Sequence, residues 1–356
     1  MLDDEFIEFL RAADLQRQYR TGIDTVVKEV NQEFTDRRDA LVLDKQRNLE
    51  LDKWHRNIVN SCIFPFTEAE MVSKVGYHFV RASPLHESGV PNFDFLLYNP
   101  AKAIAILGEA KGQLNDEGQV VNQTRERMRS AIAHADYIKN AYLNSNSADY
   151  DFVLGVQWAD ANRLAKSVAR KGGGIVVWQS GSDLRSGDDR LGILVPGNEE
   201  RDVVRTMMHR DDNLNHELSN VKTSFEYKTF FIESHPVAKL TILNFVDAGK
   251  PDGVFSFADL LELVRSEIGY MDTQTISKQA NLIIELGLRI GFIKEEGAAL
   301  YKLTSRSKKA WNRYEELKQK WIAWSIDQDT GLEIEKRRVA LQGEYRKKRE
   351  GYQFLD

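Results

Sequence analysis

Between residues 77 and 179, short apolar runs typical of buried strands alternate with polar–apolar stretches at helical spacing. We expect strands at 77–82, 93–98, 103–110, 152–158 and 174–179, and helices at 67–75, 122–143 and 160–170. A turn at 99–102 joins the second and third strands into a hairpin. This order, α-β-β-β-α-β-α-β, predicts an α/β fold in which helices cover a mixed sheet.

The segments on either side of this region differ from it in composition and in hydrophobic spacing. These differences predict five parts in the chain. They are a helical arm (1–63), a sheet domain (64–200), a helical linker (201–234), a domain of three helices and two strand-like runs (235–305) and a charged helical tail (306–356). A further strand is expected at 191–195 and a helix at 199–218. Residues 1–60 hold 10 Lys and Arg against 13 Asp and Glu, so we expect the arm to be a brace or a dimer arm rather than a clamp on DNA.

The composition excludes several classes of protein. Cys62 is the only cysteine, which excludes disulfides within the chain and cysteine-based zinc sites. The apolar runs fall far short of the roughly 18 residues that a membrane span needs, and the first residues are acidic where a secretory signal is basic. We therefore expect a cytoplasmic protein with no membrane partner. The net charge of −5 argues against a uniformly cationic surface but not against local basic patches.

The motif that carries chemistry is Asp94 followed by Glu109-Ala110-Lys111 at the end of the third strand. Because side chains alternate along a strand, Glu109 and Lys111 project from the same face. Asp94 lies on the partner strand of the hairpin, at a position from which its side chain can approach Glu109. The rest of the third strand is apolar, so an acid and a lysine at its end have no evident packing role.

Two carboxylates and an ammonium at one sheet edge suit metal-assisted hydrolysis of a phosphodiester bond. Asp94 and Glu109 offer hard oxygen ligands for Mg²⁺, and Lys111 can orient the attacking water or stabilise negative charge. The plainer alternative is that both acids are ion-paired with Lys111 or with nearby arginines, because this spacing also occurs by chance. The hairpin, the helix before it and the β-α-β order after it favour the metal site.

The motif and the order of elements over residues 66–179 resemble the PD-(D/E)xK nuclease superfamily, to which many type II restriction endonucleases belong. The resemblance implies an α-β-β-β-α-β core with Asp94, Glu109 and Lys111 as the motif residues and Mg²⁺ as the cofactor. Pro91 stands three residues before the aspartate instead of directly before it. This departure leaves the chemistry unchanged, because the proline takes no part in it.

The resemblance also implies a glutamate from the first core helix. Glu68 is the first choice for this residue and Glu70 the alternative, although Glu70 could instead be the acid of a capping box with Thr67. Gln123, at the start of the next helix, could touch metal-bound water or DNA, but a solvated helix residue is the plainer expectation.

The remaining candidate motifs are weaker. The histidines, at positions 55, 78, 86, 134, 209, 216 and 235, lack the paired spacing of metal ligands, so each is expected to be a surface or core residue. The triple glycine at 172–174 has no phosphate-binding pattern and precedes a strand. We therefore expect a loop there and no nucleotide cofactor.

Residues 235–305 resemble a winged-helix domain. Helices are expected at 236–246, 257–268 and 276–286, the second capped by Ser256, followed by strand-like runs at 291–294 and 299–303. Residues 273–320 hold ten Lys and Arg against five Asp and Glu, which favours DNA binding over the alternative of a protein-docking role. The candidate base-reading residues are Gln274, Ser277, Lys278, Gln279 and Asn281, and the candidate phosphate contacts are Lys302, Arg306, Lys308 and Lys309.

Taken together, the sequence predicts a Mg²⁺-dependent DNA endonuclease, most specifically a type II restriction endonuclease whose winged helix reads double-stranded DNA. Double-strand cleavage needs two active sites, which implies a homodimer or two successive nicks, and a restriction system implies a cognate DNA methyltransferase. Two alternatives stay open: a repair or antiphage nuclease with structural specificity, and a non-catalytic winged-helix DNA-binding protein with a silent nuclease fold. The nuclease domain could also read DNA through its own loop at 112–118.

Overall fold

The fold divides into two compact units. The computed structural model describes residues 4–85, 90–145, 147–182, 189–193, 207–218, 221–223, 236–246, 253–268, 272–297, 299–305, 307 and 309–352. One unit contains residues 1–48, 287–294 and 303–356, and the larger unit contains residues 49–286 and 295–302.

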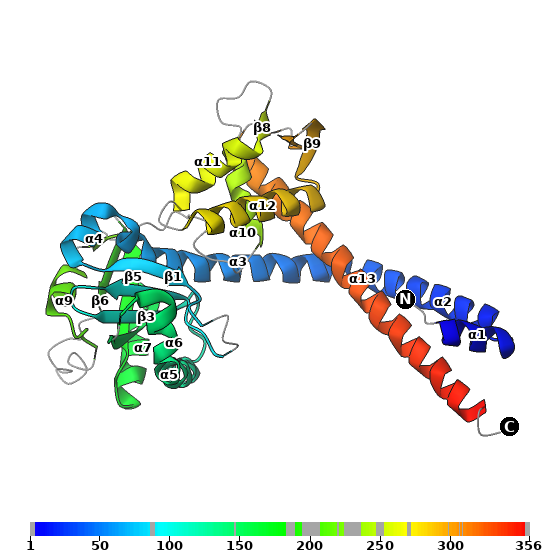
Figure 1. Ribbon diagram of the computed structural model, residues 1–356, viewed down its shortest axis with the longest axis horizontal. Helices are drawn as coiled ribbons and strands as arrows, with labels where there is room; N and C mark the ends of the chain where they lie inside the picture. The colour runs from blue at the N-terminus through cyan, green and yellow to red at the C-terminus, as the bar shows by residue number, and fades with distance from the viewer. Residues whose placement is uncertain are drawn as a thin grey trace. The chain divides into compact units, whose positions relative to one another are not determined.

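Within the described residues, the larger unit is built on a seven-stranded mixed sheet in the order β1-β2-β3-β4-β5-β6-β7 (Figure 1). Its strands are β1 (His78–Ala82), β2 (Phe95–Asn99), β3 (Ile104–Lys111), β4 (Asp149–Gln157), β5 (Val176–Ser182), β6 (Asp189–Ile193) and β7 (Val221–Lys222). The pairs β3–β4 and β4–β5 are parallel, and the other pairs are antiparallel. The α/β class and the mixed sheet predicted from the sequence are confirmed.

Helices connect these strands in the predicted order. They are the end of α3 (Arg38–Ile63), the 3₁₀ turn η1 (Phe64–Thr67), α4 (Ala69–Val75), α5 (Glu117–Ala133), α6 (Ala135–Ile138), the π-helical turn η3 (Lys139–Leu143), α7 (Trp158–Arg170) and α9 (Asp212–Leu218). The single helix expected at 122–143 is therefore three segments, the first of which begins five residues earlier because Asp116 caps it by accepting from Gln119 N.

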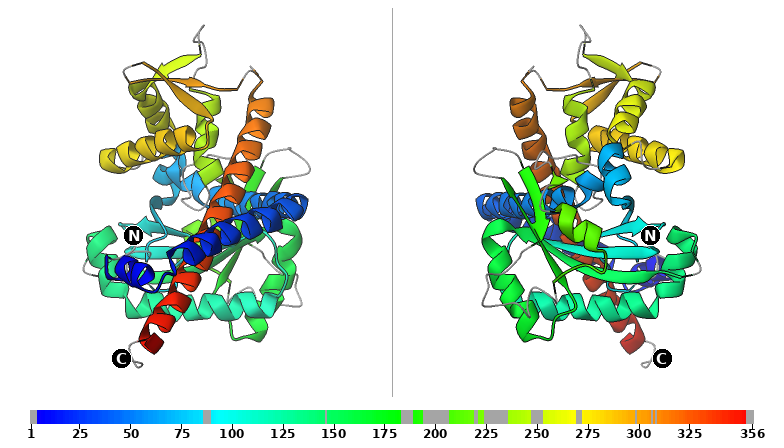
Figure 2. Two further views of the ribbon diagram at one scale, coloured as in Figure 1. Left: turned by 90° about the vertical axis from the view of Figure 1, so that its right-hand side faces the viewer. Right: turned by 90° about the vertical axis from the view of Figure 1, so that its left-hand side faces the viewer.

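The sheet is covered on both faces, which can be followed from the side in Figure 2. On one face α3 packs closely, since a Cβ on Gly155 of β4 would lie 2.5 Å from Cys62 Sγ. On the other face, Leu154 of β4 packs in a buried cluster with Val121 of α5 and Leu164 of α7. Two helices from opposite faces, α3 and α5, can thus deliver side chains to the same edge of the sheet.

The helix expected at 199–218 is wrong for residues 207–211, which are not helical; residues 194–206 lie outside the described part of the chain. Instead, His209 turns into the core, where Trp178 Nε1 donates to its Nε2 (2.8 Å) and its Nδ1 faces Asp151 Oδ2 (3.2 Å). These buried contacts hold the segment in a non-helical path. Since α9 and β7 then join the sheet unit, that unit extends beyond the boundary expected at residue 200.

Asp211 fixes the start of α9, and its negative charge contributes to the stability of the fold. Its Oδ1 accepts from Asn213 N (3.0 Å) and Leu214 N (3.3 Å) and pairs with Lys102 Nζ, while the residue is 2% exposed. Burial acts to raise the pKa of this carboxyl, but the hydrogen bond and charge of Lys102, with the backbone N–H groups, hold the pKa below its usual range. The charged carboxylate therefore stabilises the fold above its unfolded pKa, and this contribution is lost as the pH falls below about 4 through the lowered folded pKa.

We expect Asp211→Asn, which keeps a capping oxygen but removes the charge, to lower the free energy of unfolding at pH 7 by about 1–3 kcal/mol. Urea unfolding of both proteins at a series of pH values measures the difference. It should shrink below pH 4, because the wild-type carboxyl then becomes protonated. A difference that does not change with pH would refute the role of the charge.

The described residues between 236 and 305 form another group of helices and short strands, separate from the seven-stranded sheet. They are α10 (Pro236–Leu240), the 3₁₀ turn η5 (Thr241–Asn244), β8 (Val254–Ser256), α11 (Phe257–Ile268), α12 (Thr273–Arg289), β9 (Ile293–Gly297) and β10 (Leu300–Leu303), with the strands in the order β8-β10-β9. Ser256 caps α11 as expected, because its Oγ accepts from Asp259 N (3.2 Å) while Asp259 Oδ2 accepts from Ser256 N (2.7 Å). The sequence did not reveal the short strand β8.

The smaller unit is dominated by two long helices that pack side by side (Figure 1). They are α2 (Gln16–Asp36), preceded by α1 (Asp4–Ala12), and α13 (Ala310–Tyr352). Arg337 of α13 makes a bidentate pair with Glu33 of α2 (2.9 and 2.6 Å), and Tyr19 meets Tyr345 edge to face. The expected helical arm and charged tail are therefore partners of each other, in antiparallel directions.

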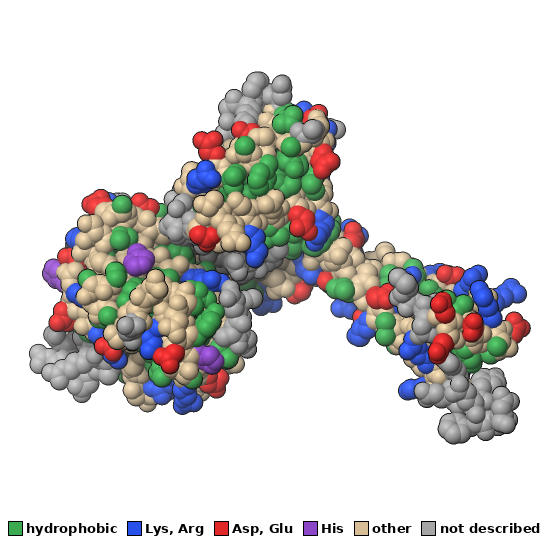
Figure 3. Space-filling view, viewed as in Figure 1, with side chains coloured by type: hydrophobic (Ala, Val, Ile, Leu, Met, Phe, Trp, Pro, Cys, Tyr) green, Lys and Arg blue, Asp and Glu red, His purple; other side chains and the backbone are tan. Residues whose placement is uncertain are grey.

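Among the described residues, no helix has both the length and the apolar character needed to cross a membrane. Acidic and basic side chains are interspersed over the face drawn in Figure 3, in keeping with 49 Lys and Arg against 54 Asp and Glu.

Candidate active site

The candidate site lies where β2 begins and β3 ends. In the antiparallel register Phe95 pairs with Gly108, and Asp94 N donates to Gly108 O (2.8 Å). The next position along each strand therefore sets Asp94 opposite Glu109. Lys111, two residues further on, lies on the same face as Glu109, and its Nζ pairs with Glu109 Oε1. The structure thus brings together the three motif residues that the sequence predicted.

Asp94 is held from two directions. Its Oδ2 accepts from Ala110 N (2.7 Å), a bond between the two strands, and faces His55 Nε2 of α3 (3.2 Å). The Asp94 side chain is 25% exposed and that of His55 is 30% exposed. The carboxylate is therefore fixed in place by the sheet and by a helix, yet remains open to solvent on one side.

Glu109 is much more buried, with 3% of its surface exposed. Its Oε1 pairs with Lys111 Nζ and also with Arg127 NH1 of α5. Arg127 reaches the sheet from the face opposite α3. Two cations therefore hold one oxygen of this acid.

The site's pKa values follow from these contacts. Burial raises the pKa of Glu109, and the charge of Asp94 adds to this, so that together they outweigh the opposing charges of Lys111 and Arg127. Burial also acts to raise the pKa of Asp94, but the hydrogen bond and charge of His55, with the Ala110 N–H, leave that pKa below its usual range. Burial lowers the pKa of His55, yet the bond to Asp94 and the charges of both acids raise it overall.

The donor set fits a divalent cation. Asp94 Oδ1 and Glu109 Oε2 have no hydrogen-bond or ion-pair partner among the described residues, because the contacts above use the other oxygen of each carboxylate. Two hard oxygen donors from opposite positions of a strand pair are the ligand type that Mg²⁺ and Mn²⁺ take. The described part of the chain has no group of three or more His, Cys, Asp or Glu side chains arranged for a metal, so the protein would supply two side-chain ligands.

Glu68 is not brought to this site. It is exposed, takes the N-cap position of α4 and makes no hydrogen bond or ion pair with the motif residues in the described structure. The expected capping box is also wrong, since Thr67 Oγ1 donates to Phe64 O (2.8 Å) and the α4 cap has no side-chain bond. The reason is that α3, rather than α4, covers the sheet next to Asp94.

His55 and Arg127 were missed as site residues, whereas Gln123 is the solvated helix residue that the sequence favoured. Gln123 is exposed, whereas Arg127, one turn later on the same helix, reaches Glu109. A signal for His55 was present, because Ile58, Val59 and Cys62 follow it at spacings of three, four and seven and mark a buried helix face. That pattern predicts packing on the sheet but does not say which strand end the helix reaches.

The predicted base-reading residues fall on α12 with mixed exposure. Gln274, Lys278 and Asn281 are exposed and Ser277 is half-buried, as the outer-face assignment requires. Gln279 is a correction, since it is 9% exposed: it lies three residues after Ile276 and four before Ile283, on the helix face that packs inward. Among the predicted phosphate contacts, Lys302 is half-buried on β10 and Lys309 is exposed, while Arg306 and Lys308 lie outside the described residues.

Comparisons with protein-family models, with curated proteins and with solved structures found no match to this chain.

Proposed function

We propose that this chain is a Mg²⁺-dependent DNA endonuclease of the PD-(D/E)xK type. The observation that supports it most is the pair of facing carboxylates, Asp94 and Glu109, each with one oxygen unengaged and with Lys111 beside them. A purely structural ion pair has no need of two acids close enough for the charge of Asp94 to raise the pKa of Glu109. A bound divalent cation would relieve this repulsion.

Each residue of the site has a distinct role in this mechanism. A bound Mg²⁺ would polarise the scissile phosphate and acidify a water. Asp94 and Glu109 hold the cation, and the Lys111 ammonium orients the attacking water or stabilises charge on the phosphate. Arg127 and His55 are positioning residues, because they fix Glu109 and Asp94 from the two faces of the sheet.

The elements from α10 to β10 are proposed to be a winged-helix DNA reader. Their order and the exposed Gln274, Lys278 and Asn281 on α12 support this. Since the described part of one chain carries one such site, cutting both strands requires a homodimer or two successive nicks. As a type II restriction endonuclease, the protein would work with a DNA methyltransferase that protects the same sequence.

Incubation of the full-length protein and Mg²⁺ with unmethylated and methylated plasmid DNA tests the proposal. Discrete bands from unmethylated DNA alone are expected of a restriction endonuclease. A smear from both plasmids would favour the alternative of a repair or antiphage nuclease with structural specificity. No cleavage of either plasmid would favour a DNA-binding protein with a silent nuclease fold and would contradict the proposed activity.

The reader assignment predicts two classes of variant. If Asn281 contacts a base edge, Asn281→Ala should cost about 1–3 kcal/mol at one base pair and relax the preference there. Lys309→Ala should instead weaken binding to all sequences alike and reduce the salt dependence. Binding isotherms on a set of single-base variants of the cleaved site, at several salt concentrations, measure both effects. Uniform weakening by Asn281→Ala would show that α12 does not read bases.

A further inference from the structure

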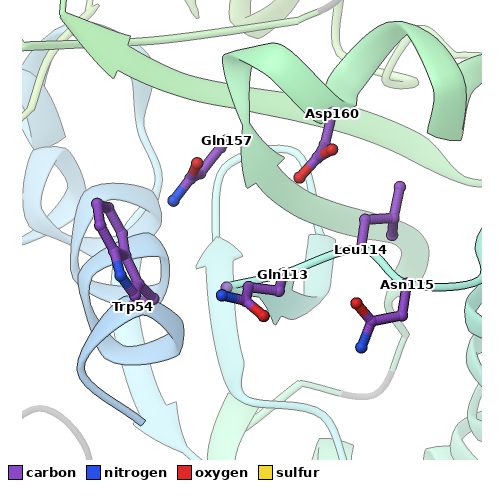
Figure 4. Close-up of a pocket in the computed structure, with 7 residues that line it drawn as sticks. Trp54, Gln113, Leu114, Asn115, Gln157 and Asp160 are labelled. Atoms are coloured by element: carbon purple, nitrogen blue, oxygen red, sulfur yellow. The ribbon is translucent and has the colours of Figure 1, made fainter. Parts of the chain in front are cut away.

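A pocket of about 400 Å³, within the size range of small-ligand sites, is lined by sequence neighbours of the site residues His55 and Lys111 (Figure 4). Its lining includes Trp54, Gln113, Leu114, Asn115, Gln157 and Asp160. Trp54 precedes His55 in α3, and the loop from Gly112 follows Lys111 directly. Because adjacent Cα atoms are about 3.8 Å apart, the backbone that lines the pocket lies next to that of His55 and Lys111.

The walls of the pocket are held in place by packing. A Cβ on Gly112 would lie 2.4 Å from His55 N, so the absence of a side chain lets the loop lie against α3. Leu114 is 6% exposed and is anchored in the core cluster beneath α7. Arg163 donates to Leu114 O (3.1 Å) and to Asp160 Oδ1 (2.7 Å), which ties the loop to α7. The pocket is therefore largely preformed.

The groups that face this space are an aromatic ring and several unengaged polar atoms. The Trp54 side chain comes from α3 on one side, and Gln157 and Asp160 come from the end of β4 and the start of α7 (Figure 4). Trp54 is 42% exposed. Within the described part of the chain, no hydrogen bond or ion pair engages the side-chain amides of Gln113, Asn115 and Gln157 or the Trp54 indole N–H.

This chemistry suits a nucleobase. An indole face stacks on any base, and amides that donate and accept can pair with a base edge. A phosphate is a poor occupant, because among the described residues no Lys or Arg lines the pocket and Asp160 is negative. Bases held in such pockets are displaced from the stack of the strand that the enzyme acts on.

We propose that the pocket receives one nucleobase, displaced from the stack, of the DNA strand whose phosphodiester bond lies at Asp94 and Glu109. Trp54 stacks on the base, and Gln113, Asn115 and Gln157 pair with its edge. The inference rests on the proposed function, whose substrate it specifies: a strand with an unstacked base next to the scissile bond.

The pocket can be tested without turnover by measuring how tightly the protein binds labelled single-stranded DNA in EDTA. Fluorescence anisotropy reports the binding. One strand carries bases throughout, and a second of the same length carries abasic spacers. We expect wild-type protein to bind the base-containing strand about tenfold more tightly or better. Trp54→Ala should remove this difference while the affinity for the abasic strand stays unchanged, and Trp54→Phe should retain part of it.

Trp158→Ala is the matched control, because Trp158 is also an exposed tryptophan, at 64%, and is adjacent to Gln157 in the sequence but does not line the pocket. It should keep the full preference for bases. Gln113→Ala should lower the preference less than Trp54→Ala does. Equal binding of both strands by wild-type protein, no binding of either, or a loss in Trp54→Ala that affects both strands alike would overturn the proposal.

The proposed nuclease activity and the proposed base pocket can be contradicted independently of each other. A base preference that depends on Trp54, in a protein that cleaves no DNA with Mg²⁺, would contradict the nuclease activity and retain the pocket. Cleavage by a protein with no base preference would contradict the pocket alone.

Discussion

Replacing Glu109 by glutamine should lower the rate of DNA cleavage by about a thousandfold or more. The substitution keeps the size of the side chain but removes the charge that holds the cation beside Asp94. Loss of such a ligand typically costs several kcal/mol of barrier stabilisation, and each 1.4 kcal/mol is a factor of ten in rate. Asp94→Asn and Lys111→Ala should have effects of the same kind. DNA binding should largely survive in all three, since none removes the basic residues between α12 and α13 that are proposed to contact DNA.

The measurement is single-turnover cleavage of plasmid DNA in Mg²⁺, with DNA affinity determined in parallel. Glu126→Gln is the matched control, because Glu126 is an exposed acid next to Arg127 on α5. It should cleave at the wild-type rate. Cleavage by Glu109→Gln within a few-fold of wild type would show that the acid pair is only an ion-paired cluster.

Gly108→Ala should produce the second large effect, on stability. In the β2–β3 pair, a Cβ on Gly108 would lie 1.9 Å from Phe95 Cζ. The Phe95 ring is fully buried and stacks on Trp178 at 6.0 Å between centroids, so it cannot move aside without repacking the core. Overpacking of this kind costs about 1–3 kcal/mol and sometimes more.

Urea unfolding of Gly108→Ala and Gly192→Ala measures this effect against a control. A Cβ on Gly192 of β6 would meet its nearest atom, Gln179 Nε2, at an ordinary 3.7 Å. That substitution should leave the free energy of unfolding within about 0.5 kcal/mol of wild type. Equal stability of the two variants would contradict the close packing of β2 on β3. Because Phe95 and Gly108 adjoin Asp94 and Glu109, Gly108→Ala should also slow cleavage.

Local patterns were enough to predict strands β1 to β6 and the motif, but not the two-residue strand β7. Strand β2 and most of β3 are short apolar runs, and the hairpin turn at 99–102 determines the register that sets Asp94 opposite Glu109. The placement of both carboxylates and of Lys111 therefore followed from the hairpin together with period-two alternation. The observed bounds of the elements differ from the predicted ones by a few residues. For example, β4 begins three residues before its predicted start.

The features that were not predicted depend on contacts distant in sequence. His55 reaches Asp94 across 39 residues, and the pairing of α2 with α13 joins Glu33 to Arg337 across 304 residues. An amphipathic helix shows which face is buried but not what covers it. For the same reason, Glu68 was placed in the site from the order of elements, although the helix that reaches Asp94 is α3.

Removal and return of the metal test the central claim most directly. After exhaustive treatment with EDTA, the wild-type protein should cleave no DNA. Mg²⁺ or Mn²⁺ should restore cleavage, because carboxylate oxygens accept both ions, while Ca²⁺ should support DNA binding more than turnover. Full cleavage in EDTA would contradict a mechanism in which Asp94 and Glu109 act by holding a divalent cation.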